Sequence, residues 1–145
     1  MSSTFLNSCL LQFRYYKELG EKTIEQVPEI KLSFQINNET NSINTIVKHL
    51  SGNMVSRWTD FLISDGEKES RNRDDEFEDT IKSKKELMEI WEKGWKVLFD
   101  TLEKLNFQDL EKIIYIRNEG HTVTESINRQ LCHYSYHVGQ IVMIG

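Results

Sequence analysis

Apolar residues recur with helical spacing over the first part of the chain, from about Thr4 to about Gln26. The stripe consists of Leu6, Leu10, Phe13, Gly20, Ile24 and Val27, and Cys9 and Tyr16 lie beside it. A period of about 3.6 residues predicts an amphipathic helix with one buried face. Pro28, the only proline in the chain, cannot continue a helix and is expected to end it.

A second helical pattern follows a short connection. Asn41 or Ser42 is suited to cap its start, because a short polar side chain accepts hydrogen bonds from the free backbone N–H groups of the first turn. The apolar positions of this pattern are Ile43, Ile46, Val47, Leu50, Met54, Trp58, Phe61 and Leu62. They predict one helix that extends to about Leu62, which Gly52 weakens without breaking.

The third helical pattern begins at a capping box, in which Ser83 precedes Glu86 by three residues. Its apolar positions are Leu87, Ile90, Trp91, Trp95, Leu98, Leu102 and Leu105. Between this pattern and the next lies a β-branched and aromatic run, Lys112–Arg117, closed by Asn118–Gly120. This run is typical either of one arm of a small hairpin or of an extended connection.

A second capping box, Thr122–Glu125, opens a fourth helix. Its expected inner face consists of Ile127, Leu131, Tyr134, Val138, Ile141 and Val142. Four amphipathic helices, with a long crossover between the second and third and a short extended segment before the fourth, predict an all-α four-helix bundle. We expect residues 1–145 to form a single domain, and three Trp, five Tyr and seven Phe supply its core.

Charge adds one local feature to this picture. The chain carries 23 acidic and 18 basic residues, and the whole excess of acid lies in the stretch Asp65–Asp79, within the crossover. Residues 65–79 therefore read as a long charged loop, whose arginines should turn inward or form ion pairs while its acids face solvent. The remaining basic residues are scattered, which argues against a nucleic-acid ligand.

Other compositional features bear on the location of the protein. No apolar run is long enough to span a membrane, and the N-terminal residues do not resemble a signal peptide, so we expect a cytoplasmic protein without membrane contact. Cys9 and Cys132 are too few for a disulfide framework, and both are expected to be small buried side chains.

Candidate chemistry centres on histidine. His133 and His137 are four residues apart on the fourth helix, so that their imidazoles project from one side within reach of a single metal ion. Tyr134 stands where an H-E-x-x-H protease would carry its glutamate, which disfavours that activity. His49 lies on the second helix and can complete a three-histidine site if the second and fourth helices are neighbours, whereas His121 is expected to be solvated.

Three neutral imidazoles would leave a divalent ion its full charge and at least one open coordination position. That combination is typical of a reactive site rather than of a purely structural one. Water bound to such an ion has a lowered pKa, and a thiol ligand is deprotonated.

Several short motifs follow one another in a characteristic order over most of the chain from about residue 41. They are Asn41-Ser42-Ile43, His49, Gly52-Asn53, Arg57-Trp58, Asp60-Phe61-Leu62, Asp65-Gly66-Glu67-Lys68, Arg71-Asn72-Arg73-Asp74, Glu76-Phe77, His133-Tyr134-Ser135-Tyr136-His137 and Gly139-Gln140-Ile141. In these motifs the chain resembles the DinB-like superfamily of the YfiT type, in a branch known as a domain of unknown function. The resemblance implies a four-helix bundle, commonly a homodimer, in which a divalent nickel or zinc ion is held by residues matching His49, His133 and His137. It also implies that the last helix and a tail continue past Gly145 in proteins of this kind.

Relatives in the superfamily include bacillithiol S-transferases and mycothiol-dependent isomerases. The resemblance therefore suggests a metal-dependent transferase that joins a low-molecular-weight thiol to an electrophile. The anionic thiol would be bound by cationic and neutral donors, for which the candidates are Arg57, Arg71, Arg73, Asn53 and Gln130. The arginines could instead pair with nearby acids, namely Asp60, Asp65, Asp74 and Asp75.

Two other functions remain open. A hydrolase would use metal-activated water, but no additional carboxylate stands at a helical spacing from the histidines to act as its base. A non-enzymatic stress or scaffold protein would use the metal to tie the second and fourth helices together.

Overall fold

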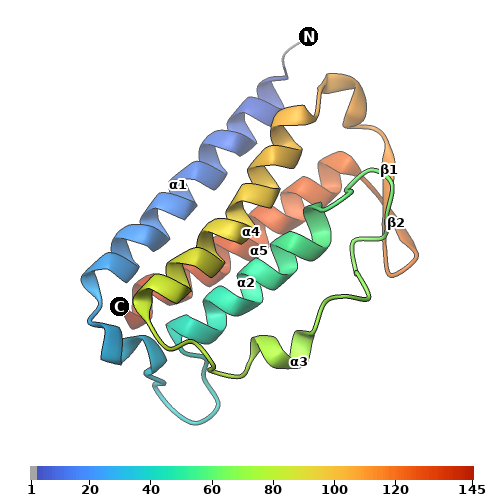
Figure 1. Cartoon of the computed structure of the whole chain (residues 1–145). Helices are drawn as coiled ribbons and strands as arrows, with labels where there is room; N and C mark the ends of the chain where they lie inside the picture. Colours follow the sequence, from blue (N-terminus) through green and yellow to red (C-terminus); the bar gives the residue numbers. More distant parts are fainter. Residues whose placement is uncertain (1–2) are drawn as a thin grey trace.

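The computed structural model describes residues 3–145 and is mostly helical. Within this range four long helices lie side by side (Figure 1): α1 (Thr4–Gln26), α2 (Ile43–Trp58), α4 (Lys84–Lys104) and α5 (Val123–Ile144). The shorter elements are the 3₁₀ helices η1 (Glu29–Ser33) and η2 (Phe107–Asp109), the one-turn helix α3 (Arg73–Glu76), and the strands β1 (Ile113–Ile116) and β2 (Glu119–Thr122). None of the helices in residues 3–145 combines the length and apolar character needed to cross a membrane.

The long helices begin where short polar side chains can cap them. Ser42, Ser83 and Thr122 each accept a hydrogen bond from the backbone N–H three residues further on, at 3.1–3.2 Å. These contacts satisfy donors that have no partner inside the helix. The predicted starts of α2, α4 and α5 are therefore confirmed. Both predicted ends of α1 also agree with the structure.

The order of packing around the core explains the long crossover. α2 packs against α4 and α5, and α1 packs against α5 and α4. α2 and α4 run in the same direction, since Ser51 Oγ donates to the carbonyl of Ile90 and, further along both helices, Thr101 Oγ1 donates to that of Trp58. Parallel neighbours cannot be joined by a short turn, so residues 59–83 return along the length of the pair.

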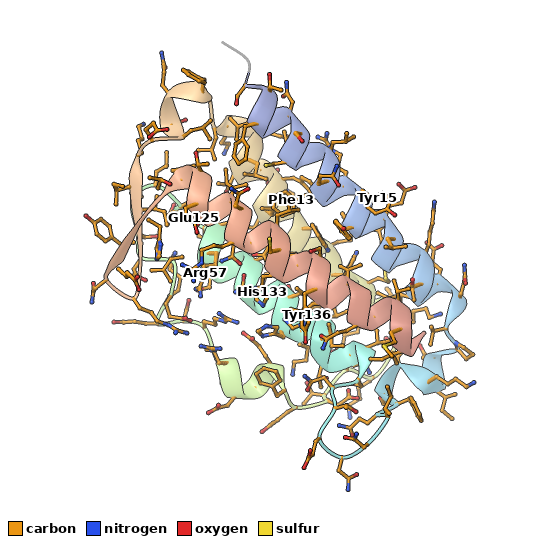
Figure 2. All side chains as sticks on the ribbon, turned by 180° about the vertical axis from the view of Figure 1, so that it is seen from behind. Phe13, Tyr15, Arg57, Glu125, His133 and Tyr136 are labelled. Carbon is orange, nitrogen blue, oxygen red and sulfur yellow. The ribbon has the colours of Figure 1, made fainter. Side chains whose placement is uncertain are left out.

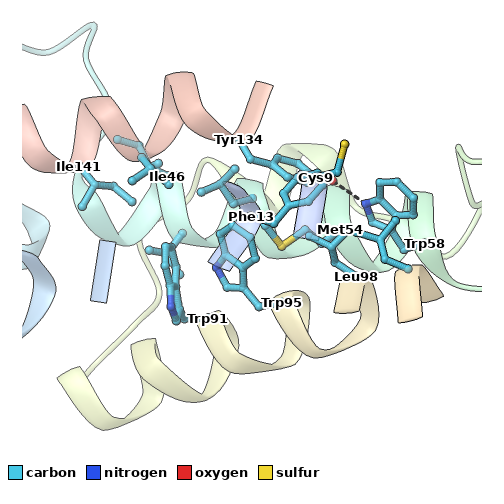
Figure 3. Packing of buried hydrophobic residues seen from close by; sticks show 14 of the residues in the cluster. Cys9, Phe13, Ile46, Met54, Trp58, Trp91, Trp95, Leu98, Tyr134 and Ile141 are labelled. Carbon is cyan, nitrogen blue, oxygen red and sulfur yellow. Dashed lines mark hydrogen bonds between the residues drawn. The ribbon is translucent and has the colours of Figure 1, made fainter. Parts of the chain in front are cut away.

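The core is rich in large aromatic side chains (Figure 3). Trp58, Trp91, Trp95 and Tyr134 are almost completely buried, and the Trp95 ring lies near both Trp91 and Tyr134. Small residues let the helices approach: a Cβ at Gly94 of α4 would lie 2.8 Å from Ser51 Cα of α2. At this point the backbones of α2 and α4 are in direct contact, with no room for a side chain on Gly94.

The second helix is shorter than its apolar pattern predicts. It ends at Trp58 rather than near Leu62, and Asp60 has a left-handed φ of 49°, which turns the chain away from the helix axis. Phe61 still packs in the core, whereas Leu62 is exposed. Apolar periodicity continued past the true end because residues of the following turn also contact the core.

The short apolar run before α5 is one arm of a hairpin, which was one of the two predicted alternatives. β1 pairs antiparallel with β2, and Ile116 faces Glu119 across the turn. Arg117 and Asn118 form this turn with positive φ values of 53° and 64°, the backbone that a two-residue hairpin turn favours. The turn was expected at Asn118–Gly120, but Gly120 lies within β2.

Two further residues that were predicted to be buried are exposed. Cys9 is buried but Cys132 is exposed, and Val142 of α5 is also exposed. Val142 was included because it continues the apolar pattern of the last helix, whereas Cys132 was expected to be buried because free cysteines usually are.

The charged stretch 65–79 forms an ordered connection that contains α3. Its first residue fastens it to the hairpin, since the Asp65 carboxylate accepts hydrogen bonds of 2.8–2.9 Å from the backbone N–H groups of Glu67, Arg117 and Asn118. Gly66 N–H donates to the Tyr115 carbonyl at 2.8 Å. The loop is therefore held at one end by β1 and its turn.

Candidate metal centre

Three histidines from two neighbouring helices converge at one point. His49 lies on the face of α2 that meets α5, and His133 and His137 lie one turn apart on α5. The Nε2 atom of His133 is 3.3 Å from that of His49 and 3.0 Å from that of His137. Figure 2 shows His133 between the ribbons of α5 and α2. The structure thus brings together the three residues expected from the sequence.

An oxygen acceptor orients each of these rings. The Nδ1 atom of His49 lies 3.0 Å from Glu76 Oε1, that of His137 lies 2.7 Å from Gln140 Oε1, and that of His133 lies 3.4 Å from Gln130 Oε1. The Glu76 carboxylate can only accept, which places the proton of a neutral His49 ring on Nδ1, and the amide oxygens of Gln140 and Gln130 favour the same tautomer in the other two rings. Each Nε2 then presents a lone pair to the centre of the cluster.

The arrangement of lone pairs tests whether a metal ion fits. Three Nε2 lone pairs that converge without a shared proton repel one another, and a cation between them would remove that repulsion. Ligand atoms about 2.05 Å from a tetrahedral zinc ion lie about 3.3 Å apart, close to the two Nε2 separations of this cluster. One ligand atom from each of the three histidines lies within 4.8 Å of the others. These three residues can therefore hold a divalent ion.

Burial also keeps the ligands in the neutral form that a metal needs. Desolvation, followed by the proximity of His137 and His49, lowers the pKa of His133 to about 4. Burial likewise lowers the pKa of His137 below its ordinary value. Both rings are unprotonated at neutral pH and do not have to lose a proton before they bind a cation.

The partner of His49 comes from the charged loop. Glu76 is buried, with a side chain 7% exposed, and Arg71 donates to both of its oxygens at 2.8 and 2.9 Å. Burial alone would raise the pKa of Glu76, but the hydrogen bonds from Arg71 and His49 lower it below the usual value. The carboxylate is therefore ionised and fixed in place. The expectation that the acids of this loop face solvent is wrong for Glu76.

A polar pocket of about 300 Å³ adjoins the histidines. Its lining contains all five candidate donors predicted from the sequence and adds a further arginine, Arg129. The lining residues are His49, Asn53, Arg57, Arg71, Arg73, Arg129, Gln130 and His133. Four guanidinium groups around one small volume make this pocket strongly attractive to anions.

The arginines of this pocket differ in how far they are already paired. Arg57 donates to the Gly66 carbonyl at 2.6 Å and reaches Glu67, and Arg71 pairs with Glu67 and Glu76. The partners are glutamates rather than the four aspartates considered from the sequence. Arg73 is exposed, and among the side chains of residues 3–145 Arg129 forms hydrogen bonds only with the ring of His121. These two keep donors for a ligand.

The two amide candidates also have partly committed side chains. Asn53 Oδ1 accepts a 2.6 Å hydrogen bond from the buried Tyr134 hydroxyl, and Gln130 Oε1 faces His133. Their NH₂ groups remain available as donors. His121 lies in β2, outside the cluster, and is half-buried beside Arg129 rather than fully solvated as expected.

Sequence reasoning missed three residues around the histidines. Gln140 follows His137 by three positions, so the helical i, i+3 relation could have identified it as the partner of that ring. Arg129 is adjacent to a predicted donor, Gln130, on the same helix. Glu76 lies on a separate segment, and no periodicity connects it to His49.

Comparison with known proteins places the chain in a family whose function is described as unknown. The whole chain, residues 1–145, matches the model of a family described as a protein of unknown function (DUF1572). No curated protein matches the chain.

Proposed function

The chain belongs to the DUF1572 family, and on that premise we propose that it is a divalent-metal-binding protein of the DinB-like superfamily. Its four long helices correspond in this proposal to the four-helix bundle of that superfamily. The observation that carries the proposal is that His133 Nε2 lies 3.3 Å from His49 Nε2 and 3.0 Å from His137 Nε2, with an oxygen acceptor at Nδ1 of each ring. Nickel and zinc are the proposed ions, because both accept imidazole ligands readily.

We further propose that the protein is a metal-dependent transferase for a low-molecular-weight thiol of the bacillithiol type. A bound divalent ion would lower the pKa of a thiol at the open position. The thiol sulfur then forms a bond to a carbon of the electrophile, the bond from that carbon to its leaving group breaks, and the thiol proton passes to solvent. The pocket supports an anionic thiol because Arg73 and Arg129 retain free donors beside His133.

Hydrolysis fits the pocket less well. A metal-activated water needs a nearby base, and among residues 3–145 the pocket lining includes no carboxylate. Glu76 lies on the far side of His49, where its oxygens are already engaged by Arg71 and that ring. A non-enzymatic role remains the alternative, in which the ion would serve only to join α2 to α5.

The proposed activity is tested with metal-loaded protein, bacillithiol and monochlorobimane. Conjugation should require Zn²⁺ or Ni²⁺ and should fall at least tenfold in His133→Ala, because that variant lacks one ligand. His121→Ala serves as the matched control, since His121 lies outside the cluster. Equal rates in the parent protein, the metal-free protein and His133→Ala would refute a thiol transferase and leave the non-enzymatic role.

The proposal also includes a cytoplasmic location and a homodimer. Low-molecular-weight thiols are kept reduced in the cytoplasm. Leu11 and Tyr15 of α1 and Tyr136 and Met143 of α5 are exposed apolar side chains, which a second copy could cover. Light scattering on the purified protein should give about twice the monomer mass, and substitution of Tyr15 and Tyr136 by glutamate should return it to a monomer.

A further inference from the structure

The charged loop reaches the histidine cluster through one buried side chain. Glu76 ends α3, the single helical turn in the loop, and its Oε1 accepts from His49 Nδ1 at 3.0 Å. Arg71, from the same loop and with a side chain only 3% exposed, donates to both carboxylate oxygens. His49, Glu76 and Arg71 thus form a continuous buried chain from the centre of the cluster into the loop.

The second helix is shaped to receive this carboxylate. A Cβ at Gly52 would lie 2.6 Å from Glu76 Cδ and closer still to Oε2. Glycine is a poor helix former, yet it stands in the middle of α2, where any other residue would displace Glu76. The His49 ring also stacks on Phe77, the next residue of the loop, with centroids 5.4 Å apart and planes inclined by 27°. The loop therefore docks on α2 by shape as well as by charge.

Seating of the loop also builds the cationic wall of the pocket. Arg71 and Arg73 flank the start of α3 and line the pocket, while Arg57 from α2 reaches back to the loop at Gly66 and Glu67. At its other end the loop is held to the hairpin by Asp65. Among residues 3–145, Glu76 is the only loop residue whose side chain forms a hydrogen bond with a candidate metal ligand.

We propose that Glu76 is a positioning residue that couples the metal site to the charged loop. By accepting from Nδ1 it orients His49 and makes Nε2 a better ligand. A cation on Nε2 makes Nδ1–H a stronger donor, and this strengthens the contact that seats the loop. The coupling is reciprocal: occupancy of the site stabilises the seated loop, and the seated loop raises the affinity for the ion. The inference rests on the proposed metal site but not on the proposed transferase activity.

The test measures Zn²⁺ affinity by competition with a chelator, and hydrogen exchange of residues 69–80 with and without Zn²⁺. In the parent protein Zn²⁺ should slow exchange in this segment. Glu76→Ala should lower the affinity about 10- to 100-fold, the usual effect of losing such a partner, and abolish the slowing. Glu76→Gln should fall between the two, because its amide oxygen still accepts from Nδ1 while its charge is lost.

A second variant keeps the test valid if Glu76→Ala folds poorly. Gly52→Ala improves helix propensity but occupies the space of the carboxylate, so it should weaken Zn²⁺ binding and speed loop exchange in a protein that remains helical. Glu78→Ala, an exposed acid in the same loop, and Gly139→Ala, a helix glycine with open space around it, are the matched controls. Both should match the parent protein in Zn²⁺ affinity and in the slowing of loop exchange by Zn²⁺.

The outcomes separate this inference from the proposed function. Unchanged affinity in Glu76→Ala and Gly52→Ala, or identical loop exchange with and without Zn²⁺, would overturn the coupling while leaving the metal site intact. If the parent protein bound neither Zn²⁺ nor Ni²⁺, the metal site and the coupling would both be wrong.

Discussion

The indole Nε1 of Trp58 donates a 3.0 Å hydrogen bond to the hydroxyl of Tyr134, so that the core and the candidate metal centre share one polar chain (Figure 3). The same hydroxyl donates to Asn53 Oδ1 at 2.6 Å. Burial raises the pKa of Tyr134 above its usual value, which keeps the hydroxyl protonated at neutral pH. Asn53 is thereby fixed at the wall of the pocket next to His49.

Removing this hydroxyl should destabilise the protein. Tyr134→Phe leaves the Trp58 N–H and the Asn53 oxygen without a partner in the core, at an expected cost of about 1–3 kcal/mol in the free energy of unfolding. Tyr115→Phe is the matched control, because Tyr115 of β1 is exposed and lies outside both the core and the proposed dimer surface. Urea denaturation followed by tryptophan fluorescence measures both. Equal stability of the two variants would show that the hydrogen bonds of Tyr134 contribute nothing.

Binding of a metal should stabilise the fold through the histidines. A ligand present at about 100 times its dissociation constant adds about 2.7 kcal/mol to the free energy of unfolding. We therefore expect Zn²⁺ to raise the melting temperature of the parent protein and of His121→Ala, but not that of His137→Ala, which lacks one of three converging ligands. Differential scanning fluorimetry with and without a chelator provides the measurement. A shift of the same size in His137→Ala would place the ion elsewhere.

The sequence predicted the elements that periodicity and caps define, and it failed where the fold depends on contacts between distant segments. The starts of α2, α4 and α5 follow from Ser42, Ser83 and Thr122, because a capping side chain acts within one turn. The end of α2 was predicted too late, because it is set by the left-handed turn at Asp60, which no apolar pattern reveals.

The same distinction applies to the site. His133 and His137 are related by helical spacing, and His49 could be added once α2 and α5 were taken as neighbours. Glu76 could not be predicted in its role, because a carboxylate inside an acidic stretch usually faces solvent. Its burial depends on Gly52, which leaves the space, and on Arg71, which balances its charge. Neither relation appears as a local pattern.

The attachment of the loop to the hairpin should depend on pH. Hydrogen bonds from the backbone N–H groups, that of Asn118 first and then that of Glu67, lower the pKa of the Asp65 carboxyl below its usual value. A lowered folded-state pKa contributes stability above the unfolded-state value, and this contribution is lost as the pH falls through the folded-state pKa. Asp65 should therefore stabilise the protein at neutral pH and progressively less in acid.

Asp65→Asn tests this contribution. The amide offers one oxygen instead of two and no charge, so the free energy of unfolding at pH 7 should fall by about 1 kcal/mol for this half-buried group. The difference from the parent protein should shrink toward pH 3. Asp74→Asn, an exposed acid in α3 of the same loop, is the control and should change stability little. Denaturation curves measured at pH 7 and pH 3 in the presence of a chelator give the free energy of unfolding of each protein. If Asp65→Asn differed from the parent protein by the same amount at both pH values, the charge of Asp65 would contribute nothing to its contact with the hairpin.

Two helix glycines should respond in opposite directions to the same substitution. At Gly94 a Cβ would lie 2.8 Å from Ser51 Cα, whose backbone cannot move without separating α2 from α4. At Gly139 of α5 no atom lies within 4 Å of the added carbon. Alanine favours a helix over glycine by about 1 kcal/mol, so Gly139→Ala should stabilise the protein by about 0.5–1 kcal/mol.

Gly94→Ala gains the same propensity but forces the two helices apart. Overpacking of this kind costs about 1–3 kcal/mol, so the variant should be less stable than the parent protein despite its better helix former. Because His49 and Gly52 lie on the helix that would shift, Gly94→Ala should also weaken Zn²⁺ binding, whereas Gly139→Ala should leave it unchanged. Urea denaturation and chelator competition measure the two effects. Stabilisation by both substitutions would contradict the close approach of α2 and α4.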